Sequence, residues 1–347
     1  MCAELHFPFV FCSIIIGLRS NVNTVQIFTV FDSTELNMDV IEVRNLTKDY
    51  GSGRGVFDVS FGVARGEVFG FLGPNGAGKS TTIRHLMGFS APDGGQTLIF
   101  GKPTFEHYHE ILNNVGYIPG EIALPAGLTG REFIRMMQDL QGVRNAERLS
   151  RMLELFELSD AALKGDTKRM SLGVKRKLAV VTAFMSDPEV LVLDEPTSGL
   201  DPVMQDRFIE FIHEEKGRGK TILLSSHIFS EIDSTCDRIA IIKDGRIVSE
   251  FVADDLKHAS KKFYQIEFAT AADKAAFIET ARAIRTAEIV KDDGRTLFVS
   301  VDDADINAVI SALSEYGISK FSNRRESLED YFMKFYKEDK DFGGALS

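Results

Sequence analysis

The sequence predicts an α/β fold with a mixed sheet at its core and a helical insertion, followed by a small α+β unit near the C-terminus. Two short apolar runs, 68–72 and 190–193, have the length and composition of strands buried on both faces. Polar residues and a helical pattern follow each run, as expected for an α/β sheet. From Phe263 onward the order becomes strand, helix, strand, strand, helix, strand, which indicates a separate α+β unit.

Composition places the chain among ordinary globular proteins. It has 347 residues, of which 44% are hydrophobic, enough for one large or two smaller cores. The net charge of -11 argues against nucleic acid as the main partner, because phosphate neutralisation needs a basic face. Cys2, Cys12 and Cys236 lie far apart without metal-binding spacing, which is typical of a reducing compartment.

The N-terminal block predicts no membrane span. Its longest apolar run, 7–18, is shorter than the roughly 18–20 residues that a spanning helix needs, and no cationic stretch precedes it. Met38 stands directly before the strand pattern at 40–44. We expect residues 1–37 to be an extension, either a disordered tail or a mis-assigned start, in preference to a membrane anchor.

A glycine-rich loop between a strand and a helix carries the clearest chemical signal. The helix pattern runs from 79 to 87 and ends at Gly88. Without a Cβ at Gly76 and Gly78, backbone N–H groups can close around phosphate oxygens, and the helix N-terminus adds partial positive charge. The pattern matches the phosphate-loop motif, with Lys79 expected on the β- and γ-phosphates and the Ser80 hydroxyl on Mg²⁺. The predicted nucleotide-binding residues here are Gly73, Pro74, Asn75, Gly76, Ala77, Gly78, Lys79, Ser80 and Thr81.

Two carboxylates follow the apolar strand at 190–193. Ligands bind at the carboxyl ends of strands in open α/β sheets. We expect Asp194 to hold Mg²⁺ through water and Glu195 to orient or deprotonate an attacking water. A solvated turn is the alternative. His227 follows the next strand pattern, 221–226, in the same way, and we expect it near the γ-phosphate, with a purely structural histidine as the alternative.

The remaining patterns complete the first domain. Tyr50 lies in a polar loop upstream of the phosphate loop, so base stacking and an ordinary surface position both stay open. Residues from about 129 to 164 have helical spacing, and another helix pattern begins at 170–177 and runs to about 186. Asp244-Gly245 marks a hairpin. The segment 106–110 carries histidines and glutamates, but they do not share one face, so a solvated surface is favoured over a metal site.

Taken in order, these motifs resemble the nucleotide-binding subunit of an ATP-binding-cassette (ABC) protein over residues 39–255. The series consists of Tyr50, the loop 73–81, the signature 170–174, Asp194-Glu195, the segment 198–201 and His227. The resemblance implies a P-loop NTPase cassette over 38–255, with a mixed sheet core and a helical subdomain at about 125–186.

The resemblance also implies a role for each motif and the partners of the chain. Tyr50 would stack on adenine, His227 would contact the γ-phosphate, and Asp201 would lie across a dimer interface. Ser171 and Gly173 would cap the ATP that a second copy holds. A homodimer or mixed cassette dimer would thus sandwich two ATP with Mg²⁺. Its hydrolysis would drive a separate transmembrane permease at the cytoplasmic face of a bacterial or archaeal plasma membrane.

Two positions depart from the family pattern. Leu172 stands where the signature usually has glycine. Pro119-Gly120-Glu121 stands where the family has a loop glutamine that senses Mg²⁺ and relays to the permease. We expect Glu121 to take over this relay and the contact to the metal. A Ser-Leu-Gly signature with this loop resembles the drug- and antibiotic-export branch.

The C-terminal pattern predicts a ferredoxin-like domain over 262–338, followed by a tail over 339–347. A last amphipathic helix presents Leu328, Tyr331, Phe332 and Phe335 at helical spacing, and we expect this stripe to pack on its own domain. The family resemblance leaves open a regulatory or dimer-stabilising role for this C-terminal domain.

Two other classes of function stay open at this level. One is a soluble ABC ATPase acting on ribosomes or DNA, which the single phosphate loop, the acidic charge and the lack of sustained heptads disfavour. The other is a nucleotide sensor that does not hydrolyse ATP, which the presence of Glu195 disfavours.

Overall fold

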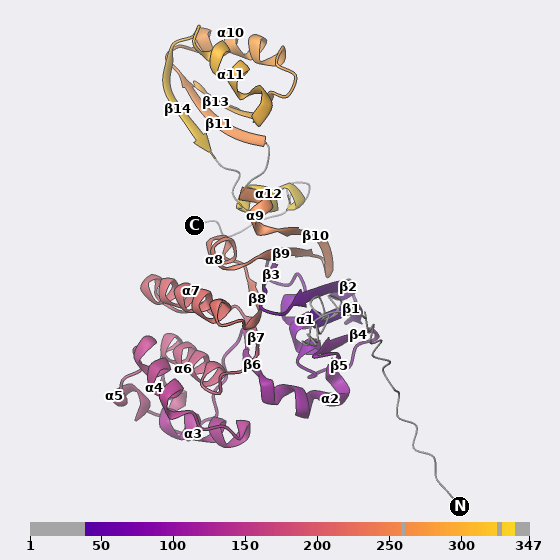
Figure 1. The fold of residues 1–347 in the computed structure, drawn as a ribbon, viewed down its shortest axis with the longest axis vertical. Coiled ribbons are helices and arrows are strands. Elements are labelled where there is room, and N and C mark those ends of the chain that lie inside the picture. The colour runs from indigo at the N-terminus through magenta and orange to yellow at the C-terminus, as the bar shows by residue number, and fades with distance from the viewer. Residues whose placement is uncertain (1–38, 258–260, 325–327, 337–347) are drawn as a thin grey trace, which may run out of the picture. The chain divides into compact units, whose positions relative to one another are not determined.

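The computed structural model describes residues 39–257, 261–324 and 328–336 (Figure 1). The predicted extension over 1–37 and the tail over 339–347 lie outside these residues. The elements, in order, are β1 (Asp39–Asp49), β2 (Gly55–Ala64), β3 (Val68–Leu72), α1 (Lys79–Leu86), β4 (Gly94–Ile99), β5 (Lys102–Pro103), α2 (Thr104–Ile111), η2 (Leu112–Asn114), β6 (Val115–Ile118), α3 (Gly130–Gln141), α4 (Ala146–Leu155), α5 (Asp160–Leu163), η3 (Thr167–Arg169), α6 (Leu172–Phe184), β7 (Val190–Asp194), α7 (Pro202–Gly217), β8 (Thr221–Ser226), α8 (Phe229–Thr235), β9 (Arg238–Lys243), β10 (Arg246–Val252), α9 (Ala253–Lys257), β11 (Lys261–Phe268), α10 (Ala271–Arg282), β12 (Glu288–Asp293), β13 (Thr296–Asp302), η4 (Asp303–Asp305), α11 (Ile306–Leu313), β14 (Ile318–Arg324) and α12 (Leu328–Tyr336).

A six-stranded sheet in the order β10-β9-β3-β8-β7-β6 forms the centre of the first part of the chain. Its strands are parallel except β10, which closes the predicted Asp244-Gly245 hairpin. Alternate residues of each parallel strand enter different cores. On β7, Leu191 and Leu193 face one hydrophobic cluster and Val190 and Val192 face another. The central parallel strands are therefore buried on both faces, as their apolar runs predict.

One face of this sheet is covered by a second sheet and by α1. The second sheet is antiparallel, in the order β2-β1-β4-β5. Ile83 and Leu86 of α1 join Phe69 and Phe71 of β3 in the same hydrophobic cluster. This packing holds the start of α1 at the end of β3, where the glycine-rich loop lies.

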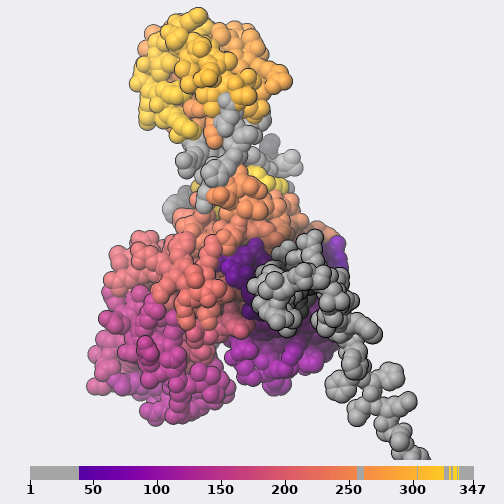
Figure 2. Space-filling view, in the orientation of Figure 1, coloured from indigo at the N-terminus to yellow at the C-terminus, as the bar shows by residue number. Residues whose placement is uncertain are grey.

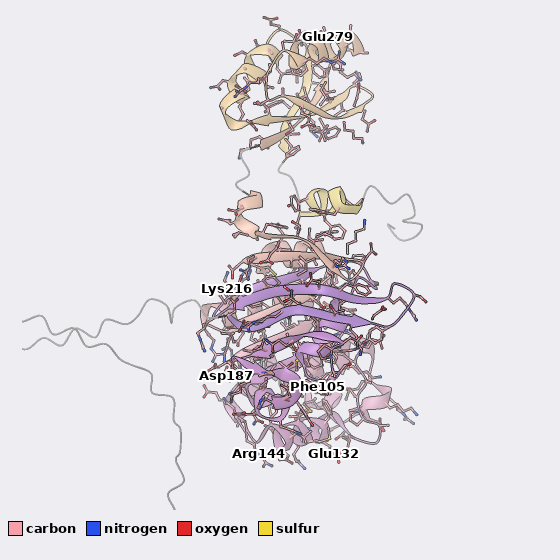
Figure 3. The ribbon with its side chains drawn as sticks, turned by 90° about the vertical axis from the view of Figure 1, so that its right-hand side faces the viewer. Phe105, Glu132, Arg144, Asp187, Lys216 and Glu279 are labelled. Carbon is pink, nitrogen blue, oxygen red and sulfur yellow. The ribbon has the colours of Figure 1, made fainter. Side chains whose placement is uncertain are left out.

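Helices cover the other face. Helices α3 to α6, magenta in Figure 2, gather in one lobe of the surface. Thr129 and Glu132 form a capping box at the start of α3, since each side chain accepts a hydrogen bond from the other's backbone N–H. Glu132 is labelled in Figure 3. The predicted helical insertion is therefore present. Among the described residues, none of the helices combines the length and apolarity needed to cross a lipid bilayer.

The α+β unit at the C-terminal end has a sheet of its own. Its order is β12-β13-β11-β14, every neighbouring pair is antiparallel, and helices α10 and α11 supply residues to a third hydrophobic cluster. The predicted βαββαβ order of a ferredoxin-like unit is confirmed.

Helix α12 corrects the prediction that its apolar stripe packs on this C-terminal sheet. Phe332 packs against Phe229 of α8 with ring centroids 5.0 Å apart, and Tyr331 packs against Phe251 of β10 at 4.7 Å. Leu328 and Phe332 belong to the helix-covered cluster of the first part of the chain. The physical reason is the availability of apolar surface: α10 and α11 already cover the C-terminal sheet, whereas β10 is an edge strand with a half-buried face.

Candidate active site

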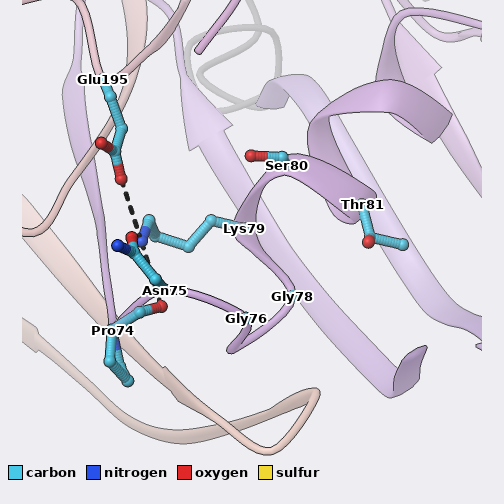
Figure 4. A pocket seen from close by; sticks show the side chains of 8 residues that line it. All are labelled: Pro74, Asn75, Gly76, Gly78, Lys79, Ser80, Thr81 and Glu195. Atoms are coloured by element: carbon cyan, nitrogen blue, oxygen red, sulfur yellow. Dashed lines mark hydrogen bonds and ion pairs between the residues drawn. The ribbon is translucent and has the colours of Figure 1, made fainter. Parts of the chain in front are cut away.

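A hollow of about 120 Å³ lies at the carboxyl end of β3 and β7 (Figure 4). It combines the glycine-rich loop with one carboxylate from a segment more than a hundred residues away. The lining residues are Pro74, Asn75, Gly76, Gly78, Lys79, Ser80, Thr81 and Glu195.

Three glycines shape the loop for different reasons. A Cβ on Gly73 would lie 2.6 Å from the Ile242 carbonyl oxygen, so only glycine fits there. Gly78 has φ +115°, and a Cβ on it would also lie 2.8 Å from Val56. Gly76 faces open space but has φ +83°, a conformation that side chains with a Cβ rarely adopt.

Lys79 begins α1 and is 5% exposed. Its ammonium Nζ donates to the carbonyl oxygens of Gly73 at 2.6 Å and Pro74 at 3.2 Å. It also lies 3.3 Å from Oε1 of Glu195 (Figure 4). The Lys79 ammonium thus lies near the N-terminus of α1, where an anionic ligand is favoured.

Asp194 is the last residue of β7 and is almost fully buried. Ser225, its neighbour on the parallel strand β8, donates its hydroxyl to Oδ1 of Asp194. A Cβ on Gly120 would lie 3.0 Å from Oδ2, so the missing side chain at Gly120 leaves this oxygen uncrowded.

Glu195 adopts φ +47°, which is uncommon for a residue with a side chain. Its N–H donates to the Ser225 carbonyl at 2.9 Å. Its carboxylate lies between two partners, with Oε1 3.3 Å from Lys79 Nζ and Oε2 3.0 Å from Nδ1 of His227. A strained backbone held by its surroundings is a common feature of functional sites.

The other predicted site residues do not line the hollow. Tyr50 is half exposed in the turn after β1, and Ser171 and Asp201 are the exposed N-cap residues of α6 and α7. Gly173 lies against the Gly199 carbonyl. Glu121 is exposed, and the residue of its loop that lies against Asp194 is Gly120.

Sequence reasoning missed Arg176, which is 2% exposed on α6. Its guanidinium donates to the carbonyl oxygens of Ser198, Pro119 and Gly120 at 2.9, 2.9 and 2.7 Å. A signal was present in the run 175–177. Three consecutive basic residues on a helix point in three directions, so the run does not lie on a single solvated face.

The donor set at the hollow fits a magnesium ion bound together with phosphate. Mg²⁺ prefers oxygen ligands and is usually held by one or two carboxylates plus substrate phosphates. Ser80 lines the hollow and supplies a hydroxyl, and Asp194, the buried residue before Glu195, supplies Oδ2. Within 39–257, 261–324 and 328–336, no group of three or more His, Cys, Asp or Glu could hold a metal ion by itself.

Comparison with known proteins points in one direction. The family described as ABC transporter matches residues 56–198. The bacitracin transport ATP-binding protein BcrA of Bacillus licheniformis is 33% identical over 85% of this chain and 96% of its own length. The Nod factor export ATP-binding protein I of Paraburkholderia xenovorans is 34% identical over the same shares.

Solved structures agree. The ATP-binding subunit of an ABC transporter is 34% identical, with a TM-score of 0.58 over 63% of this chain and 92% of that one. A dimeric bacterial ABC transporter cassette has a TM-score of 0.56 over 61% of this chain and 98% of that one. At 22% identity it supports the fold alone.

Proposed function

The chain belongs to the ATP-binding proteins of the ABC transporter family, and we propose that it is the ATP-hydrolysing subunit of an exporter. The observation that carries this proposal is the position of the Glu195 carboxylate, which lies between Lys79 and His227 at the edge of the phosphate-loop hollow. This arrangement supports Glu195 as the base that would act beside the γ-phosphate.

Nucleotide binding is the first step. The N–H groups of the glycine-rich loop and the Lys79 ammonium hold the phosphates, and Tyr50 stacks on the base. Lys79 then exchanges its contact with Glu195 for phosphate oxygens, because the β- and γ-phosphates together carry more negative charge than the single carboxylate of Glu195. The exchange releases Glu195 to act on water.

Ser80 and Asp194 would hold Mg²⁺, and the ion would supply positive charge against the phosphates. Glu195 orients a water molecule and accepts its proton while the water oxygen attacks the γ-phosphorus. The bond to the β–γ bridging oxygen breaks, so ADP and phosphate are the products. His227 holds the Glu195 carboxylate through Nδ1 and contacts the γ-phosphate.

The site needs a second cassette. Ser171 and Gly173 lie outside the hollow of their own chain, and Ser171 and Leu172 are exposed. We propose that these residues close on the ATP of a second copy, with Asp201 across the interface. The two copies drive a separate permease at the cytoplasmic face of the membrane. The relatives named for bacitracin transport and Nod factor export support transport over an action on ribosomes or DNA.

Glu121 is proposed to relay between nucleotide and permease. Its carboxylate is exposed, so a membrane partner can reach it, whereas Gly120 occupies the position against Asp194. Exposure therefore favours the relay over a direct contact with the metal.

The test compares Glu195→Gln with the wild-type protein in a magnesium-ATP hydrolysis assay. Loss of the base should lower kcat by about 100-fold or more, while ATP binding remains and an ATP-bound dimer accumulates in gel filtration. The matched control is Glu189→Gln, an exposed glutamate at the other end of the same strand, which should behave as wild type.

Lys79→Ala should abolish hydrolysis in the same assay, because the variant lacks the ammonium that binds the phosphates. With the permease present, Glu121→Ala should remove the stimulation by permease and leave the basal rate unchanged. Hydrolysis by Glu195→Gln at the wild-type rate would refute the assignment of the base.

A further inference from the structure

We propose that Arg176 is the positioning residue that couples the signature helix α6 to both catalytic carboxylates. The inference rests on the proposed function and adds to it the residue that positions Asp194 and Glu195 for hydrolysis. Its basis is a buried guanidinium that binds three carbonyl oxygens from two separate loops.

One loop leads to Asp194. Arg176 donates from Nη1 to Pro119 and from Nη2 to Gly120, the two residues that follow β6. Gly120 in turn lies against the Asp194 carboxylate, since even one added carbon there would come within 3.0 Å of Oδ2. A shift of this loop would therefore reach Asp194 directly.

The other loop leads to Glu195. Arg176 donates from Nε to the carbonyl of Ser198, and the N–H of Ser198 donates to the carbonyl of Glu195 at 3.2 Å. The turn from 195 to 198 thus carries the strained residue at one end and the arginine contact at the other. Movement of the arginine would change where the Glu195 carboxylate points.

The same helix begins with the residues expected to meet a second copy. Gly173 and Leu172 at the start of α6 both lie against Gly199 in the loop that Arg176 holds. The planar fork of an arginine fixes several acceptors at once, and no other side chain presents as many donors. Contact with a second copy at the start of α6 is therefore transmitted to both carboxylates through one rigid group.

The surroundings of Arg176 are consistent with a guanidinium that stays charged in order to hold these two loops. Burial lowers the pKa of the Arg176 guanidinium, while the nearby carboxylates of Glu195, Asp194 and Glu231 act in the opposite direction. Carbonyl oxygens satisfy the hydrogen bonds of the cation and leave the catalytic carboxylates free of a direct arginine contact.

The experiment compares Arg176→Lys and Arg176→Met with Arg148→Lys. Arg148 is a matched control, because it is also buried in the helical lobe, pairs with Glu215 at 2.7 Å and donates to the Phe184 carbonyl. None of these contacts reaches Asp194 or Glu195. Lysine at 176 keeps the charge but cannot bind three divergent carbonyls, so it tests the geometry in a protein that is expected to fold.

Both Arg176 variants should lower kcat at least 10-fold while KM for ATP stays within about 3-fold, because the phosphate loop itself is unchanged. Without nucleotide, amide hydrogen exchange should accelerate in segments 115–121 and 195–199. Arg148→Lys should lower thermal stability and leave kcat and exchange in these segments unchanged.

Wild-type kcat and wild-type exchange in Arg176→Lys would overturn the inference. An equal loss of kcat in Arg148→Lys would overturn it as well, since a general effect on folding would then suffice. An inactive wild-type protein would refute the proposed function instead, because the exchange measurement needs no hydrolysis.

Discussion

Glu231 is a residue whose environment changes its chemistry. It lies on α8, four positions after His227, and is 2% exposed. Burial raises the pKa of its carboxyl group to about 7, although the hydroxyl of Ser226 donates to Oε2 at 2.5 Å and favours the charged form. In the folded chain this group is protonated at pH values where an ordinary glutamate is ionised.

The raised pKa of Glu231 predicts how stability depends on pH. Between pH 4.5 and about pH 7, Glu231 holds a proton in the folded state that it has lost in the unfolded state. The protonated carboxyl group therefore contributes its full share to the free energy of unfolding below pH 4.5, and this share disappears as the pH rises through 7. The difference between the two pKa values corresponds to about 3 kcal/mol. Glu231→Gln should therefore become progressively more stable relative to wild type from pH 5 to pH 8, measured by urea unfolding.

Glu214→Gln is the control for this experiment, since Glu214 is an exposed glutamate on α7. Its stability relative to wild type should stay constant over the same range. If the difference in unfolding free energy between Glu231→Gln and wild type stayed constant from pH 5 to pH 8, Glu231 would be ionised in the folded chain over that range.

At the scale of elements, α12 connects the end of the described chain to the segment that carries His227. The hydroxyl of Tyr331 lies 3.1 Å from that of Ser249, and Lys243 donates to the Phe335 carbonyl at 3.0 Å. Together with the aromatic contacts to α8 and β10, these bonds attach the helix to β9 and β10. Helix α12 therefore contributes to the stability of the ATP-binding part of the chain.

Phe332→Ala is expected to lower the free energy of unfolding by about 3–4 kcal/mol, because it removes a buried aromatic ring and leaves a cavity between α12 and α8. Phe105→Ala on α2 is the matched control (Phe105 is labelled in Figure 3). That ring is 47% exposed, so its removal should change stability by no more than about 0.5 kcal/mol. Chemical denaturation measures both. Equal effects of the two variants would contradict the packing of α12.

At the scale of the whole molecule, the buried hydrophobic residues of the part that the structure describes divide into three clusters. Two share the six-stranded sheet, one on each face, while the third belongs to the sheet of β11 to β14 and has no member in common with them. Cooperative unfolding follows shared cores. We therefore expect the C-terminal sheet to unfold as a unit separate from the ATP-binding part.

Calorimetry should resolve this second transition. Phe277→Ala removes a fully buried ring from the third cluster and should lower the temperature of that transition alone, while hydrolysis of ATP continues at the wild-type rate. A single transition that shifts as a whole would show that the clusters unfold together.

The sequence by itself determined the features that depend on neighbours along the chain. The phosphate loop, the strand before Asp194, the Asp244-Gly245 turn and the βαββαβ order are all set by residue types at short spacing. Period and turn chemistry act locally, so these features can be read without knowledge of the fold.

The tertiary structure decided which distant groups meet. It placed Glu195 between Lys79 and His227, turned Arg176 rather than Lys175 or Lys177 into the core, and seated α12 on α8 and β10. An amphipathic stripe predicts only that one face of a helix is buried, and a basic run predicts only that a face is solvated. Which surface covers it depends on the apolar area that the other elements leave open, and that is a property of the complete fold.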